Sequence, residues 1–352
     1  MILIKVTVII PIYNARRYLR ECLDSVIAQS LRDIEIICVD DCSTDDSPAL
    51  LREFAAIDSR VKILQTEKNT GSGGARNLGI AQAVGQYIIF CDSDDVYPLN
   101  ALKILYEAAA ASSDIDFSAG NIAIMEAGKK CNVDALRRMG MKIAERAVDL
   151  PANIPALWIP WFHQRCLIKR DFILENNLKY PLISRGQDPP FMANVFCVAG
   201  KAAVLPDIVY LYRKHGLHKL DTERKFDDYL LHINLVTDIF KKYGFAKQAL
   251  IYLYFTANGL LGISFFINFT RGQRKKIIAG YFNLFESFKP ESTAAFFEPL
   301  SSDPEQIGKL MLRLRKGKGF CHWVFWRLFW RLFRRLFWKI FRIFQFCRTP
   351  GP

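Results

Sequence analysis

The first 125 residues alternate short apolar runs with amphipathic segments, and this alternation restricts the possible folds more than any other feature of the chain. Continuous apolar runs rich in β-branched residues predict buried strands at residues 4–12, 34–39, 61–64 and 87–91. Repeated strand–helix units of this length predict an α/β fold, with a mainly parallel central sheet flanked by helices.

Helix-starting residues lie between the predicted strands. Asn14 is expected to cap the helix after the first strand, and Ser47, followed by proline, to cap the helix after the second. A third helix is expected from about Gly74. Residues 150–215 indicate loops and short strands, and the pattern becomes helical from about Phe226.

Acidic residues follow two of the strands, at the sheet edge where α/β folds bind ligands. Asp92 and Asp94 could hold a hard divalent cation that also ligates phosphate oxygens. Alternatively, Asp94 or Asp95 caps the next helix. Asp40 and Asp41 could accept hydrogen bonds from a nucleotide base or ribose, or could be ordinary turn residues. Neither pair decides the function by itself.

A glycine-rich turn at residues 69–77 precedes the third helix. Glycines let the backbone approach a ligand closely, and a helix N-terminus favours an anion. Arg76 stands where the dinucleotide fingerprint has its last glycine, and the turn follows the third strand, which disfavours a dehydrogenase. A cation near a helix N-terminus opposes the helix dipole, so Arg76 indicates a bound anion such as a diphosphate, or else a solvated side chain.

Together these segments resemble glycosyltransferase family 2. The resemblance is specific across residues 4–98 and continues more loosely to about residue 215. It rests on four motifs in the expected order, which are VTVIIPIYN at 6–14, VDDCSTD at 39–45, GSGGARN at 71–77 and FCDSDD at 90–95.

The resemblance implies the GT-A nucleotide-diphospho-sugar transferase fold. The catalytic domain would span residues 1–220, with a nucleotide-binding half at 1–98 and an acceptor-side half at 99–220. A C-terminal helical region would follow at 221–308, and a tail helix at 309–352. A non-processive enzyme is implied, because the Gln-x-x-Arg-Trp signature of the processive members is absent from the sequence.

The resemblance also assigns roles to the matching positions. Asp40 or Asp41 would contact the base, and Arg76 and Asn77 would lie near the ribose and diphosphate of a UDP-sugar. Asp92 and Asp94 would be the DxD pair, with Asp94 the direct ligand to Mg²⁺ or Mn²⁺. The implied nucleotide-sugar positions are Pro11, Tyr13, Asn14, Asp40, Asp41, Gly71, Arg76, Asn77, Asp92 and Ser93.

The family's catalytic base lies in a Glu-Asp pair followed by Phe, and the matching segment here is GQDPPF at 186–191. Gln187 replaces the glutamate, while Asp188 keeps the carboxylate that would deprotonate an acceptor hydroxyl. A single displacement would invert the anomeric centre. Alternatively, Asp188 is a turn residue before Pro189. A non-catalytic nucleotide-sugar-binding or scaffolding protein on the same fold is the competing hypothesis, and it would tolerate loss of Asp188.

The net charge of +13 is concentrated in the tail. Residues 309–352 hold twelve Lys or Arg and no Asp or Glu, so residues 1–308 carry only +1. This distribution disfavours nucleic acid as a partner. A basic stripe among aromatic residues predicts an amphipathic helix on an anionic membrane surface. Its predicted membrane-binding residues are Trp326, Arg327, Trp330, Arg331, Arg335, Trp338, Lys339 and Arg342.

A packing helix or a contact in a homo-oligomer is the alternative use of the tail. Membrane attachment would place the site near a glycan or lipid-linked acceptor of the bacterial cell envelope. Nine scattered cysteines and the absence of a signal peptide favour the cytoplasm, at the inner face of the membrane. Residues 249–269 are uncharged and favour a buried helix pair over a membrane span. His215 and His218 are expected at the surface.

Overall fold

The computed structural model describes residues 3–126, 129–131, 142–214 and 223–260, with single positions between 270 and 287. By its internal contacts the chain divides into two units, Met1–Tyr243 and Gly244–Pro352. The first unit holds the central sheet and all of the predicted site residues that the structure describes.

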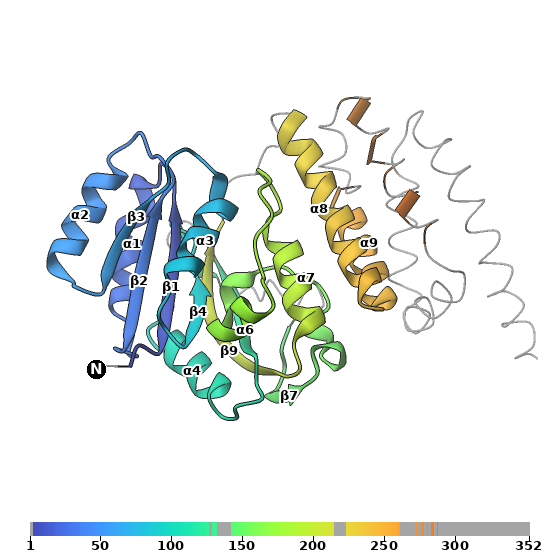
Figure 1. Ribbon diagram of the computed structural model, residues 1–352, viewed down its shortest axis with the longest axis horizontal. Coiled ribbons are helices and arrows are strands. Elements are labelled where there is room, and N and C mark those ends of the chain that lie inside the picture. The colour runs from blue at the N-terminus through green and yellow to red at the C-terminus, as the bar shows by residue number, and fades with distance from the viewer. Residues whose placement is uncertain are drawn as a thin grey trace, which may run out of the picture. The chain divides into compact units, whose positions relative to one another are not determined.

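The N-terminal half of the sheet is parallel, as the apolar runs predict. Its strands are β1 (Val6–Ile12), β2 (Ile34–Asp40), β3 (Val61–Gln65) and β4 (Tyr87–Phe90). They lie side by side in the order β3-β2-β1-β4 (Figure 1). Every residue of β1, β2 and β4 is buried, which explains why their sequences are mostly apolar instead of alternating.

The helices between these strands are α1 (Arg16–Ile27), α2 (Ser47–Ile57) and α3 (Gly71–Gln82). In α1 the apolar positions fall on the buried face as predicted. The helix α3 begins three residues before the predicted Gly74. After β4 comes α4 (Ala101–Ala109), whose N-cap residue is Asn100, so neither Asp94 nor Asp95 caps it.

Both predicted caps are wrong, because long-range contacts use the two side chains. The N-cap of α1 is Ala15, while Asn14 has a φ of 51° and accepts a hydrogen bond from the Thr44 amide at 2.7 Å. Ser47 is the first residue of α2, and its hydroxyl accepts a hydrogen bond from the Ala15 amide at 2.9 Å. The two side chains therefore join neighbouring loops at the carboxyl edge of the sheet.

The C-terminal half of the sheet mixes parallel and antiparallel pairs, which the sequence analysis did not predict. Its main strands are β5 (Phe117–Glu126), β8 (Cys166–Lys169) and β9 (Ala202–Arg213). β8 runs antiparallel to both β4 and β5, and β9 runs parallel to β5. The short strands β6 (Lys129–Cys131) and β7 (Ala147–Asp149) pair with β5 and β9.

Three 3₁₀ turns and three α-helices belong to this part of the described chain. The 3₁₀ turns are η1 (Pro151–Asn153), η2 (Pro155–Leu157) and η3 (His163–Arg165), and η3 leads directly into β8. The α-helices α6 (Arg170–Glu175), α7 (Asp188–Val198) and α8 (Glu223–Lys242) follow. α8 begins three residues before the predicted Phe226 and packs on α7, with the rings of Phe196 and Phe240 5.6 Å apart.

The second unit begins with α9 (Ala246–Leu260), which covers the first part of the uncharged segment 249–269. The rest of that segment, His215 and His218, and the tail 309–352 with its membrane-binding residues lie outside the described residues. Among the helices that the structure does describe, none has the length and apolar character to cross a membrane.

The turn before β4 lies very close to the start of β1, and a substitution at Gly85 tests this contact. A Cβ atom at this position would lie 2.6 Å from the backbone nitrogen of Thr7, so the backbone would have to move. We expect Gly85→Ala to lower the free energy of unfolding in urea by about 1–3 kcal/mol. The control is Gly200→Ala, whose Cβ would lie 3.4 Å from the nearest atom. Equal stability of the two variants would contradict the packing described here.

Candidate active site

The predicted site residues gather where β1, β2 and β4 end. Asp40 is the last residue of β2, and both Asp40 and Asp41 are 2 % exposed. Asp41 Oδ1 accepts hydrogen bonds from the Thr66 hydroxyl at 2.7 Å and from the Thr70 amide at 2.8 Å. Asp41 therefore holds the turn that leads into α3, while its buried Oδ2 has no hydrogen-bond partner in the described part of the chain.

The end of β1 presents a mixed surface beside these carboxylates. Pro11 is buried within the strand, and Tyr13, the next residue but one, is 53 % exposed. Asn14 binds the following loop, because its Oδ1 accepts hydrogen bonds from the amides of Thr44 and Asp45 at 2.7 and 3.3 Å. The exposed ring of Tyr13 is the part of this motif that a ligand can reach.

The glycine-rich turn packs closely on the protein itself. Gly71 has a φ of +74°, which favours glycine, and starts α3. A Cβ on Gly73 would lie 2.7 Å from the carbonyl oxygen of Pro181. Asn77 exchanges two hydrogen bonds of 2.9 Å with the backbone of Tyr180. Asn77 thus holds the segment before α7 against α3, and its contact with the donor's ribose or diphosphate stays a prediction.

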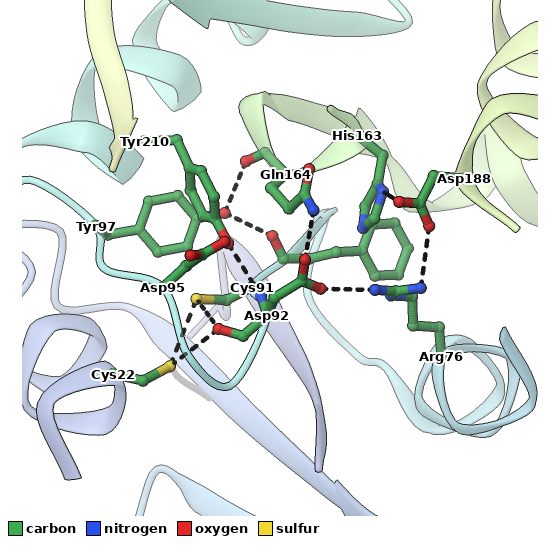
Figure 2. Close-up of polar contacts among 11 residues, drawn as sticks. Cys22, Arg76, Cys91, Asp92, Asp95, Tyr97, His163, Gln164, Asp188 and Tyr210 are labelled. Atoms are coloured by element: carbon green, nitrogen blue, oxygen red, sulfur yellow. Dashed lines mark hydrogen bonds and ion pairs between the residues drawn. The ribbon is translucent and has the colours of Figure 1, made fainter. Parts of the chain in front are cut away.

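Arg76 occupies the centre of the site. Its residue is 4 % exposed, and its two terminal nitrogens contact two carboxylates that are far apart in the sequence (Figure 2). Arg76 Nη2 lies 2.6 Å from Asp92 Oδ1, and Nη1 lies 3.1 Å from Asp188 Oδ1. The anions beside Arg76 in the structure are therefore two side chains of the protein, and its contact with a diphosphate stays a prediction.

Two further side chains contact the remaining oxygens of these carboxylates. Gln164 Nε2 donates a hydrogen bond of 2.6 Å to Asp92 Oδ2. His163 Nδ1 lies 3.2 Å from Asp188 Oδ2. All four carboxylate oxygens are thus contacted from α3 on one side and from η3 on the other (Figure 2).

The arrangement keeps Asp188 ionised. Burial alone would raise the pKa of Asp188, but the charges of His163 and Arg76 outweigh it and lower that pKa far below its ordinary value. Burial likewise opposes the charge of Arg76, and the two carboxylates overcome it and raise the pKa of the guanidinium. Asp188 is the first residue of α7, where the helix dipole also favours a negative charge.

Asp95 has a structural role. It is 1 % exposed, and it accepts hydrogen bonds from the Tyr210 hydroxyl at 2.7 Å and the Arg213 amide at 2.6 Å. Burial, together with the charges of Asp92 and Asp94, raises its pKa well above the ordinary value. These bonds tie the loop after β4 to β9, and they leave Asp92 and Asp94 as the two half-buried carboxylates of the motif.

The carboxylates of Asp92 and Asp94 suit a metal site to which the phosphates of a substrate would also contribute ligands. Within the described ranges no three His, Cys, Asp or Glu side chains form a group that could hold a metal ion. Mg²⁺ in nucleotide enzymes is usually bound by one or two carboxylates together with substrate phosphates and water. Both oxygens of Asp92 contact protein donors. The carboxylates of the motif suit such a shared site, and the assignment of Asp94 as the direct protein ligand stays a prediction.

The sequence analysis missed an aromatic cluster that surrounds the ion pairs. The rings of Tyr180 and Phe191 stack at 4.0 Å, and the ring of Phe90 meets both edge-on. His163 packs edge-on against Phe90 at 5.3 Å and against Tyr180 at 5.6 Å. In the sequence, His163 and Gln164 are a polar pair between an aromatic segment and an apolar run. Such a pair has no characteristic spacing that would have identified it as part of a site.

Comparisons with known proteins agree with this geometry. Residues 7–141 match the family model for glycosyl transferase family 2. The chain is 32 % identical over 227 residues to the glycosyltransferase GlyG of Streptococcus pneumoniae, covering 62 % of this chain and 73 % of that protein. It is 31 % identical over 220 residues to the poly(ribitol-phosphate) beta-glucosyltransferase of Bacillus spizizenii, covering 61 % of this chain but only 33 % of that protein.

Among solved structures, residues 1–349 of Staphylococcus aureus TarS in complex with UDP-GlcNAc align with a TM-score of 0.71 and 19 % identity, covering 90 % of this chain and 93 % of that one. This likeness confirms the GT-A fold. The fold and site define a nucleotide-sugar-dependent glycosyltransferase. The chain belongs to glycosyltransferase family 2.

The ion pairs of Asp188 predict a pH-dependent stability. A carboxylate whose pKa is lowered on folding stabilises the fold above its ordinary pKa near 4, and this contribution is lost as the pH falls towards the lowered value. We expect Asp188→Asn to reduce the free energy of unfolding by about 1–3 kcal/mol at neutral pH. The difference from wild type should be constant above about pH 5 and shrink below about pH 4 in urea denaturation. A difference that stays constant down to pH 3 would contradict the proposed state of Asp188.

Proposed function

We propose that the chain is a metal-dependent inverting glycosyltransferase that moves one sugar from a UDP-sugar to a hydroxyl of a cell-envelope glycan or lipid-linked acceptor. The observation that carries this proposal is the pair Asp92 and Asp188, which Arg76 bridges at the carboxyl edge of the sheet. One carboxylate belongs to the DxD motif, and the other begins α7.

On the donor side, the exposed side chain of Tyr13 is available to a nucleotide base. The contact of Asp40 or Asp41 with the base is part of the proposal, and Asp41 Oδ2 is the carboxylate oxygen that has no hydrogen-bond partner in the described part of the chain. UDP is proposed because the similar TarS structure contains UDP-GlcNAc. The remaining predicted donor contacts lie along the same edge of the sheet, at Pro11, Asn14, Asp40, Gly71 and Ser93. Asp94 would hold Mg²⁺ or Mn²⁺, which supplies positive charge to the departing diphosphate when it is bound.

On the acceptor side, Asp188 is the proposed general base. Its side chain is 28 % exposed, which supports access for an acceptor hydroxyl. The hydroxyl oxygen would form a bond to the anomeric carbon while the bond to the diphosphate breaks, and the hydroxyl proton would pass to Asp188. Because His163 and Arg76 make this carboxylate a weak base, proton transfer would accompany bond formation, when the hydroxyl becomes more acidic. A single displacement of this kind inverts the anomeric centre.

The proposed acceptor class follows from the relatives and from the tail. One relative is a poly(ribitol-phosphate) beta-glucosyltransferase, and another, 30 % identical over 223 residues, is the succinoglycan biosynthesis protein ExoO of Rhizobium meliloti. The basic aromatic tail would hold the enzyme on the anionic inner face of the cytoplasmic membrane, beside a lipid-linked acceptor. In the alternative, the tail makes a contact in a homo-oligomer.

The catalytic assignment predicts how two variants respond to a panel of nucleotide sugars. Wild type should transfer or hydrolyse one donor in a metal-dependent manner. Asp188→Asn should lower kcat by about 10²–10⁴-fold because it removes the base. Asp94→Ala should lower activity and raise the Mn²⁺ concentration needed for half-maximal rate.

The control for this panel is Asp171→Asn, because the Asp171 side chain is 64 % exposed and outside the site. UDP binding without turnover of any donor, in wild type as in Asp188→Asn, would favour the non-catalytic binding protein instead.

The membrane assignment predicts that charge reversal in the tail abolishes vesicle binding. Full-length protein should sediment with vesicles that contain anionic lipid, and Arg327→Glu combined with Arg331→Glu should remove this binding at unchanged activity on a soluble acceptor. The matched control reverses two exposed cations of the first unit, Lys103→Glu and Arg146→Glu, whose side chains are 54 % and 70 % exposed. Equal sedimentation of both double variants would refute membrane binding by the tail.

A further inference from the structure

The two central carboxylates are each contacted from two sides, and one of those sides is a single short turn. Arg76 contacts one oxygen of Asp92 and one oxygen of Asp188. The other two oxygens are contacted by His163 and Gln164, which are consecutive residues of η3. A dipeptide therefore spans the same two carboxylates that the guanidinium bridges, as Figure 2 shows.

The register of the sheet brings this turn to the site. β4 and β8 are antiparallel, and Ile88 pairs with Ile168. Continuing the same register by four residues on each chain brings Asp92 opposite Gln164. The residues before β8 therefore face those after β4, because antiparallel neighbours run past each other in opposite directions.

The turn is firmly anchored. His163 is completely buried and Gln164 is 3 % exposed. The carbonyl oxygen of Gln164 lies 2.9 Å from the hydroxyl of Tyr97, and Arg165 Nη2 donates a hydrogen bond of 2.8 Å to the carbonyl oxygen of Ala156. The aromatic cluster encloses the His163 ring.

Backbone strain accompanies this placement. Phe162, immediately before the turn, has a φ of 61°, in the left-handed region that bulky side chains avoid. Such a conformation is unfavourable and persists only where surrounding contacts hold it. Here the strained residue precedes the turn that places the side chains of His163 and Gln164 in the site.

We propose that His163 and Gln164 are positioning residues, which hold the Asp188 carboxylate for the acceptor and the Asp92 carboxylate for the donor. This inference rests on the proposed function, because it assigns Asp188 and Asp92 to different halves of the reaction. It requires that the two neighbouring side chains affect different kinetic constants. A purely structural turn would affect stability and leave the kinetic constants of the folded enzyme alike in both variants.

The test compares substitutions that keep volume and remove the nitrogen that contacts the carboxylate. His163→Leu should lower kcat by about 10–100-fold with the KM for the donor sugar nucleotide within about twofold of wild type, since a misplaced base costs rate. His163→Asn should recover most of the loss, because its amide nitrogen can take the place of Nδ1. Gln164→Met should instead raise the donor KM by about tenfold and weaken the binding of UDP in the presence of Mn²⁺, measured by calorimetry, to a similar degree.

Thermal melting and UDP binding of His163→Leu establish that this variant is folded. If it is not, Gln164→Met tests the proposal through the donor KM and the binding of UDP. The proposal is overturned if His163→Leu keeps the wild-type kcat, if the Leu and Asn variants are equally impaired, or if Gln164→Met binds UDP as wild type does. The variant Asp188→Asn distinguishes a failure of the proposed general base from a failure of the proposed positioning role. Full activity of Asp188→Asn refutes the proposed base itself, whereas its inactivity beside a fully active His163→Leu refutes only the positioning role.

Discussion

The structure of the site depends on one buried cation. Arg76 reaches Asp92, 16 residues away in the sequence, and Asp188, 112 residues away. Burying a guanidinium is costly unless it is paired, and here two carboxylates compensate for the lost hydration. Without Arg76 the two carboxylates would lie close together with no positive charge between them. The same contact therefore pairs the charge of Arg76, acts together with His163 to keep Asp188 ionised, and joins the loop after β4 to the start of α7.

Other contacts support this bridge by fixing the segments that carry it. Asp95 ties the loop after β4 to Tyr210 and Arg213 of β9, and Asn77 ties α3 to the backbone of Tyr180. In both cases a residue from a recognisable motif bonds to a part of the chain that has none. Residues of the N-terminal motifs thus hold the irregular part of the chain in place, at the polar edge of a mostly apolar sheet.

Local patterns predicted much of the N-terminal half. The strands β1, β2 and β4 were recognised because full burial makes their sequences mostly apolar, and their ends agree with prediction to within two residues. The long strand β5 was missed. Its buried polar residues, such as Ser118 and Asn121, interrupt the apolar pattern, and their hydrogen bonds go to distant backbone atoms, Asn121 donating to the carbonyl oxygen of Ile143 at 2.8 Å.

The sequence by itself determined the α/β class, the family and the edge of the sheet where acidic residues collect, because apolar periodicity and carboxylates at strand ends are local features. Only the tertiary structure decided which side chains meet there. His163 and Gln164 contact Asp188 and Asp92 because β8 runs antiparallel to β4, and Asn14 and Ser47 bind other loops instead of capping helices. Contacts between residues far apart in the chain have no fixed spacing, so no periodicity or propensity could have revealed them.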